Sequence, residues 1–268
     1  MTEHLLRRVE DGVMTLTFNR PDKKNAITDE MYDALAESLG SAARDDAVRA
    51  ILFLSTGDSF TAGNDLASFA RQSEAPRRRT DAPSNVERFI RAIANAGKPV
   101  VAGVRGRAVG IGLTMLLHCD LVFVAEDAEL SAPFVTLALV PEAASSLLLV
   151  ARLGHARAFS IFAGGRVVGG RDVADWGLAS QAVPADEVDN AARAAAKRLA
   201  RQPGEALAIT KRLMRDSGAI TARIDEELGH FADRLTSPEA QEAFRAFAER
   251  RTPDFLRVES ESWWERSG

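Results

Sequence analysis

Two apolar, β-branched runs in this chain each lead into a glycine loop, and this recurrence limits the folds that the chain can adopt. The run at 50–54 leads toward Ala62-Gly63-Asn64-Asp65-Leu66, and the run at 99–104 leads into the glycine-rich segment 106–112. Glycine beyond a buried strand lets the backbone turn sharply and leaves its N–H groups accessible. We therefore predict two loops that converge beyond the strand ends, where backbone N–H groups can stabilise an oxyanion.

An isolated carboxylate follows the two loops. Glu142 is the only charged residue between Glu129 and Arg152. Burial in so apolar a stretch would raise its pKa toward that of a useful general base. A second interpretation stays open from the residues alone, because Pro141 suits the first turn of a helix and a glutamate there favours the positive end of the helix dipole.

Strand and helix patterns alternate in the first part of the chain. Residues 13–18 have the alternation of a half-exposed strand, and Thr28 is predicted to cap a helix that extends to Gly40. The same succession returns at 48–54 and at 100–117. Later segments have helical periodicity, at 187–200, 203–214, 220–235 and 239–250. The sequence predicts an α/β fold with a helical C-terminal region.

Composition excludes several classes of protein. A chain of 268 residues can bury a core without disulfides, and its net charge of -4 argues against a nucleic-acid-binding surface. The single cysteine, Cys119, is expected to be a buried, inert thiol, and His118 a structural histidine with satisfied hydrogen bonds. The histidines are too scattered for a metal site. Residues 1–20 lack the apolar core of a secretory signal, so we expect a cytoplasmic protein that binds neither metal nor membrane.

A polar, proline-bounded stretch at 73–83 is predicted to be a surface loop. It contains three consecutive arginines, Arg77 to Arg79. Two interpretations stay open: the arginines attract a phosphate-bearing ligand, or they form a solvated charge run.

Taken in order, the motifs resemble the crotonase, or enoyl-CoA hydratase/isomerase, family. The resemblance runs from about Val13 to Phe255 and implies a crotonase-type spiral of β-β-α units with a C-terminal helical region. It implies a spiral core with an acyl-CoA site at 1–195 and a helical oligomerisation region at 196–268. The segments that carry it are Asn19-Arg20-Pro21 with Asn25-Ala26, Phe60 to Leu66, Lys98 to Ala102, and Gly106 to Gly112 with Cys119-Asp120.

The same resemblance implies the roles of individual residues. The backbone N–H groups of Asn64 and Ile111 would be the oxyanion donors, and Glu142 the catalytic acid and base. Arg250 and Arg251 would reach the phosphates of coenzyme A, which the substrate itself carries, so no separate cofactor is expected. The residues implied to bind the substrate and its coenzyme A are Lys24, Asn25, Ala26, Ala62, Gly63, Asp65, Leu66, Gly110, Thr114 and Phe134.

Departures from the family pattern indicate the reaction. Hydratases of the family use two glutamates, and the corresponding positions here are Thr114 and Phe134, neither of which is a carboxylate base. The segment 132–146 instead resembles the Δ3,Δ2-enoyl-CoA isomerases of the family, whose single glutamate lies at the position of Glu142. We therefore predict an isomerase that acts on an acyl-CoA thioester as a homotrimer or as a hexamer made of two trimers. The alternatives are a hydratase or another crotonase-type lyase or hydrolase, and a non-catalytic acyl-CoA binding protein.

Overall fold

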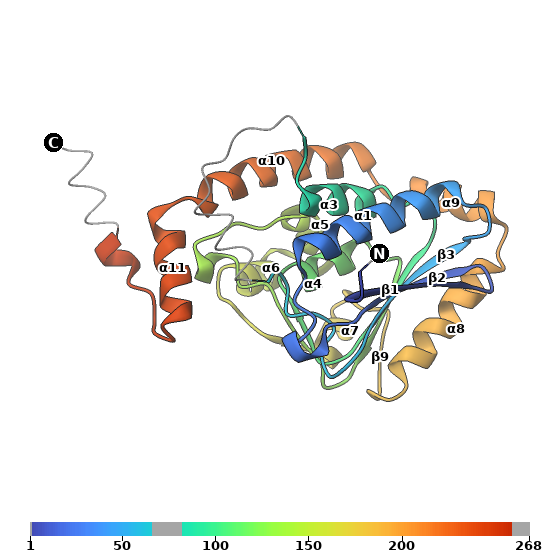
Figure 1. Cartoon of the computed structure of the whole chain (residues 1–268), viewed down its shortest axis with the longest axis horizontal. Helices are drawn as coiled ribbons and strands as arrows, with labels where there is room; N and C mark the ends of the chain where they lie inside the picture. Colours follow the sequence, from blue (N-terminus) through green and yellow to red (C-terminus); the bar gives the residue numbers. More distant parts are fainter. Residues whose placement is uncertain (1, 66–81, 259–268) are drawn as a thin grey trace.

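A computed structural model describes residues 2–65 and 82–258 of the chain (Figure 1). Several residues named above lie outside these ranges: Leu66, the arginines at 77–79 and most of the predicted surface loop. Within the described residues the fold is a mixed α/β structure, with helices on both faces of a main sheet and a helical C-terminal region.

The main sheet has six strands in the order β1-β2-β3-β4-β6-β9. β1 pairs antiparallel with β2, and every other neighbouring pair is parallel. The predicted strands at 13–18 and 50–54 are confirmed, and Val13 pairs with Ala50 in the register of β2 and β3. The bounds are Leu5–Glu10 for β1, Val13–Phe18 for β2, Ala50–Ser55 for β3, Val100–Val104 for β4, Leu121–Ala125 for β6 and Gln181–Val183 for β9.

A second sheet of three short strands has the order β5-β7-β8. Its strands are Arg107–Val109, Glu129–Ser131 and Val168–Gly169. β5 pairs parallel with β7, and a further bridge joins Ala108 to Thr61. This small sheet therefore connects the second glycine loop to the segment that follows β3.

Helices cover the main sheet on both faces (Figure 1). α1 (Asp29–Arg44), α3 (Asn85–Ala94) and α10 (Ser217–Leu235) lie on one side of it, and α8 (Val188–Ala200) lies on the other. Alanines on α8 pack against Leu52, Leu54 and Val101, because small side chains let the helix approach the strands closely. Thr28 caps α1 as predicted, since its side chain accepts a hydrogen bond from Met31 N.

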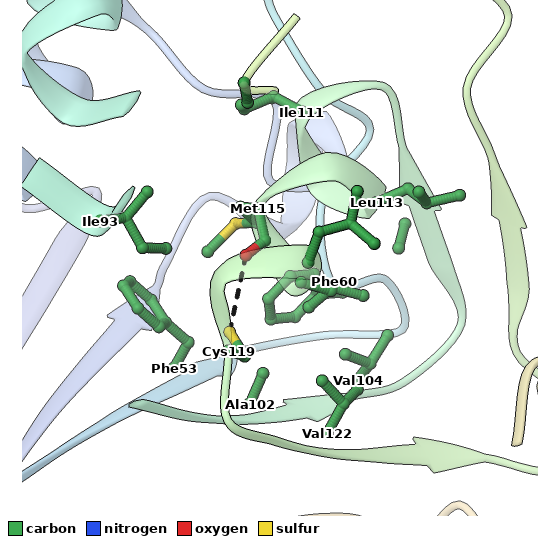
Figure 2. Close-up of a cluster of buried hydrophobic side chains, with 14 of the residues drawn as sticks. Phe53, Phe60, Ile93, Ala102, Val104, Ile111, Leu113, Met115, Cys119 and Val122 are labelled. Carbon is green, nitrogen blue, oxygen red and sulfur yellow. Dashed lines mark hydrogen bonds between the residues drawn. The ribbon is translucent and has the colours of Figure 1, made fainter. Parts of the chain in front are cut away.

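The segment after the second glycine loop lies in the core. The predicted helical stretch there forms a short α4 (Ile111–Thr114) followed by a 3-10 turn, η2 (Met115–His118). Figure 2 shows Leu113 and Met115 in one buried cluster with Phe53, Phe60 and Val122. Cys119 is buried in this cluster, as predicted, and burial raises the pKa of its thiol to about 12.

The C-terminal helices agree with the predicted segments to within a few residues. α9 spans Gly204–Leu213, and α11 (Pro238–Ala248) lies at one end of the molecule away from the main sheet (Figure 1). The expected division at residue 195 falls inside α8 and stays a prediction. The remaining helices are η1 (Pro21–Lys23), η3 (Val135–Leu137), α5 (Ser145–Leu153), α6 (His155–Phe162) and α7 (Gly170–Asp175). No helix in the described ranges is long and apolar enough to cross a membrane.

Candidate active site

The two glycine loops lie against each other, as the sequence predicts. Thr61 N donates to Arg107 O at 3.0 Å and Val109 N donates to Thr61 O at 3.0 Å. Gly63 has φ +86°, and a Cβ atom there would lie 2.7 Å from Val109 O. Only glycine fits this position, because both the backbone conformation and the neighbouring carbonyl exclude a side chain.

Two backbone N–H groups at the facing ends of the loops, those of Asn64 and Ile111, have no protein acceptor in the described part of the chain. Ile111 is the first residue of α4, so its N–H has no partner within the helix. Asn64 follows Gly63 directly, and its side-chain Oδ1 accepts a hydrogen bond from the Tyr32 hydroxyl. The loops therefore present two N–H donors on adjacent backbone segments.

Glu142 is buried, with only 6% of its surface exposed. Thr114 Oγ1, on α4, donates to Glu142 Oε1 at 2.6 Å. Burial raises the pKa of Glu142 to about 8, the Thr114 hydrogen bond acts in the opposite direction, and the Glu227 carboxylate raises it further. The helix-dipole interpretation is wrong, because α5 begins only at Ser145 and Glu142 lies before its N-cap, Ala144.

A cavity of about 750 Å³ opens at the glycine loops. Gly63, Asn64, Gly110 and Ile111 line it, so both N–H donors lie at its wall. Glu142 itself does not line the cavity; Leu139 from the same segment does. The Glu142 carboxyl therefore lies behind the wall, tied through Thr114 to the helix that begins at Ile111.

Aromatic rings form much of the cavity wall. Phe134 lines it and packs against Phe162, with ring centroids 5.8 Å apart. Phe231 on α10 and Phe244 and Phe247 on α11 line it as well. The C-terminal helices thus complete an apolar pocket that suits an apolar ligand group.

The loop at 24–26 lies beside the first glycine loop. Ala26 and Ala62 line the cavity, and Ala62 N donates to Lys24 O at 2.9 Å. Lys24 itself pairs with Asp58 on the surface, with Nζ and Oδ2 2.6 Å apart. The Asn25 side chain is fully buried and donates to the carbonyls of Thr56 and Ser59, both at 2.8 Å, so it holds the loop from inside.

Sequence reasoning missed three residues that the fold brings to this site. Exposed Lys23 lines the cavity, and Arg20 pairs with Asp65 at 2.6 Å. Tyr32, on α1, holds the Asn64 side chain. Arg20 lies within the motif Asn19-Arg20-Pro21, but nothing in the local pattern indicates that Lys23 lines the cavity or that Tyr32 reaches the first loop.

Two residues named from the sequence lie in ion pairs or in the core. Arg251 bonds Glu242 and Glu249, and these carboxylates raise its pKa, so its charge is already compensated within the chain. His118 is fully buried with both ring nitrogens hydrogen-bonded, which confirms the structural histidine.

Comparison with known proteins places the chain in a family. The sequence model described as "Enoyl-CoA hydratase/isomerase" matches residues 8–257. The 1,2-epoxyphenylacetyl-CoA isomerase of Escherichia coli K12 is 34% identical, over 95% of this chain and 99% of its own. Enoyl-CoA delta isomerase 2 of Rattus norvegicus is 32% identical over 90% of this chain, which spans 62% of the length of that relative. Other relatives, at 28% to 31% identity, are named as probable enoyl-CoA hydratases.

A solved structure confirms the fold. The enoyl-CoA hydratase/isomerase from Pseudoalteromonas atlantica has a TM-score of 0.88 and 38% sequence identity, covering 94% of this chain and 99% of its own. This chain belongs to the enoyl-CoA hydratase/isomerase, or crotonase, family, and it has the crotonase-type fold with a helical C-terminal region, as the sequence predicted.

Proposed function

We propose that this chain is a Δ3,Δ2-enoyl-CoA isomerase that uses Glu142 as its single acid and base. One observation carries the proposal: the buried Glu142 carboxyl accepts a hydrogen bond from Thr114 on α4, the helix whose first residue, Ile111, lines the cavity. Burial raises the pKa of this carboxyl to about 8. A carboxyl group with such a pKa can both accept and return a proton near neutral pH.

The two N–H groups supply the other half of the chemistry. A thioester oxygen bound by Asn64 N–H and Ile111 N–H would become more polarised, and the charge that develops on it would meet preformed donors. Glu142 would then remove a proton from C2 of a 3-enoyl-CoA and leave a dienolate. The same carboxyl group would return that proton to C4, so that the double bond moves from C3–C4 to C2–C3 with no net gain or loss of atoms.

The surroundings of the cavity favour isomerisation over hydration. Phe134 and Thr114 stand where the hydratases of the family carry glutamates, and neither can activate water as a carboxylate does. Asp65 is the only acidic residue that lines the cavity among the described residues, and Arg20 already pairs with it. A single glutamate can move a proton between two carbons, whereas water addition in this family uses two.

The proposal requires the Glu142 carboxyl to reach C2 of the bound substrate from behind the cavity wall. Catalytic contacts are often loose in free enzymes and tighten only in the substrate complex. Ala26, Ala62 and exposed Lys23 would lie along the pantetheine and phosphates of the coenzyme A that the substrate carries. The homotrimer or hexamer expected from the sequence stays a prediction, testable by light scattering of the purified protein.

The test is a spectrophotometric assay of double-bond conjugation in a 3-enoyl-CoA, run beside hydration of a 2-enoyl-CoA. We expect isomerisation by the wild-type protein and a loss of about 10²- to 10⁴-fold in kcat for Glu142→Gln, which keeps the shape of the side chain and removes its basicity. Glu205→Gln, an exposed glutamate on α9, is the matched control.

The other outcomes of these two assays would each favour one of the alternative functions. Robust hydration that survives Glu142→Gln would overturn the proposal in favour of a hydratase. Binding of acyl-CoA without turnover of either substrate would point to a binding protein or to a different crotonase reaction.

A further inference from the structure

The segment that carries Glu142 is held in an unfavourable backbone conformation. Ala138, Ala143 and Ala144 all have left-handed backbones, with φ of 57°, 60° and 54°. L-residues other than glycine, asparagine and aspartate rarely adopt this conformation, so contacts from elsewhere must hold the segment in place. We call residues 138–146 the base loop.

Helix α10 supplies contacts at both ends of the base loop. At one end, Arg234 Nε donates to Ala138 O at 3.1 Å. At the other end, Ser146 N donates to Glu227 Oε1 at 2.9 Å, and Arg223 Nη1 lies 3.3 Å from Ser146 Oγ. Three side chains from one face of α10 therefore bond the loop that carries Glu142.

The middle of the base loop is held through His118. His118 Nε2 lies 2.8 Å from Ala143 O, the carbonyl directly after Glu142. Arg215, two residues before α10, donates from Nη2 to His118 Nδ1 at 2.9 Å. Because Nδ1 must accept from the guanidinium, the hydrogen of the neutral ring is on Nε2 and is donated to Ala143 O.

Glu227 is an unusual residue for a purely structural role. It is 5% exposed, and its second oxygen, Oε2, has no hydrogen-bond partner in the described part of the chain. A buried carboxylate with incomplete hydrogen bonds costs stability, and an apolar side chain there would pack more favourably. Its other oxygen, Oε1, accepts a hydrogen bond from the backbone of the base loop, at Ser146 N.

We propose that Glu227, Arg234 and the His118–Arg215 pair are positioning residues, which hold the base loop in its left-handed conformation and so fix the Glu142 carboxyl relative to the cavity. Through Glu227 and Arg234, helix α10 in the C-terminal region controls the geometry of a reaction whose other groups lie in the α/β core. The expected effect on catalysis rests on the proposed function, whereas the expected effect on the conformation of the base loop does not.

The experiment compares Glu227→Ala, Glu227→Gln and Arg234→Ala with the control Asp233→Ala, an exposed acid on the same helix. Amide hydrogen exchange is followed in peptides that cover 138–148, and kcat and KM are measured on a 3-enoyl-CoA. We expect faster exchange in the base loop of Glu227→Ala and Arg234→Ala, and kcat lowered about 10- to 100-fold at a nearly unchanged KM. Glu227→Gln keeps an oxygen acceptor for Ser146 N and should restore both.

Two results would overturn the proposal: base-loop exchange and kcat that match the wild type in Glu227→Ala, or equal effects from Asp233→Ala. Hydrogen exchange does not depend on turnover, so a wild-type protein without isomerase activity would defeat the proposed function while the exchange result still decides the role of α10.

His118 is tested by a pair of variants, because its burial makes a loss of folding possible. His118→Gln can still donate to Ala143 O, whereas His118→Leu cannot. With melting temperatures as a check on folding, we expect kcat to fall in the leucine variant and to be largely kept in the glutamine variant. If His118→Gln and His118→Leu both fold and have equal kcat, His118 is not a positioning residue.

Discussion

The first glycine loop and the base loop both need left-handed backbone, and they obtain it in opposite ways. The first loop has Gly63 at φ +86°, next to a free N–H group. The base loop has alanines at φ +54° to +60° on either side of Glu142. Glycine adopts that conformation without steric cost, whereas the Cβ atom of alanine makes it unfavourable.

The difference shows how each half of the site is stabilised. In the first glycine loop the left-handed turn falls on a glycine, and backbone hydrogen bonds join this loop to the second loop and to the neighbouring segment at 24–27. The base loop depends on contacts from residues far along the chain, such as Ser146 with Glu227, 81 positions away, and Ala138 with Arg234, 96 positions away. We therefore expect substitutions in the glycine loops to act locally, and the geometry of the base loop to respond to changes at a distance.

Among the substitutions that test this comparison, Gly63→Ala has the largest expected effect. The new Cβ would lie 2.7 Å from Val109 O on a backbone at φ +86°, so the loop must shift and move Asn64 N–H. We expect isomerase kcat to fall about 10²- to 10³-fold, as on loss of one oxyanion donor. Gly110→Ala meets no atom within 4 Å and suffers only from its φ of +57°, so its effect should be smaller. Gly97→Ala has space around it and is the matched control; wild-type activity in Gly63→Ala would break the comparison.

The next effect is on stability and depends on pH. The pKa of Glu142 is raised from 4.5 to about 8, so the folded state binds this proton more tightly than the unfolded chain. This stabilisation of the folded state is fully present below pH 4.5 and is lost as pH rises through about 8, by on the order of 5 kcal/mol in all and about 3 kcal/mol between pH 6 and pH 9. Glu142→Gln has no proton to lose. We therefore expect the free energy of unfolding in urea, measured at pH 6 and at pH 9, to fall with pH in the wild type more than in the variant. A difference between the two proteins that is the same at both pH values would contradict the raised pKa.

Thr114→Val tests the link between α4 and the base loop. It keeps the side-chain shape and removes the hydrogen bond that lowers the pKa of Glu142. We expect kcat/KM to fall about tenfold, since a hydrogen bond to a charged group contributes roughly 1.5 to 3 kcal/mol. The rising limb of its pH profile should move to higher pH. Thr114→Ser keeps a hydroxyl and should behave as the wild type; a limb that stays in place in the valine variant would show that Glu142 is not the titrating base.

The smallest effect concerns the strain in the base loop itself. Ala138 is only partly buried and has φ 57°, so Ala138→Gly removes a left-handed penalty of about 1 to 2 kcal/mol while adding roughly 0.5 to 1 kcal/mol of backbone entropy cost. We expect a net stabilisation of about 0.5 to 1 kcal/mol in urea unfolding. Ala206→Gly, on an exposed position of α9, should instead destabilise by about 1 kcal/mol. Destabilisation by Ala138→Gly would mean that the backbone there is not strained.

Much of the fold was predictable because it depends on local patterns. The strand at 13–18, the Thr28 cap and the C-terminal helices all follow from periodicity and capping, which are properties of adjacent residues. The convergence of the glycine loops was predictable as well, because neighbouring parallel strands bring their carboxyl ends to one edge of the sheet.

The sequence by itself determined the alternation of strands and helices, the positions of the glycines, and an isolated acid in an apolar stretch. Only the tertiary structure decided that Glu142 precedes α5, that Tyr32 reaches Asn64, that phenylalanines from α10 and α11 line the cavity, and that α10 contacts the base loop. The physical reason is the distance along the chain over which each kind of interaction acts. Backbone propensity acts over a few residues, whereas these hydrogen bonds and ring contacts join side chains that only the packed core brings together.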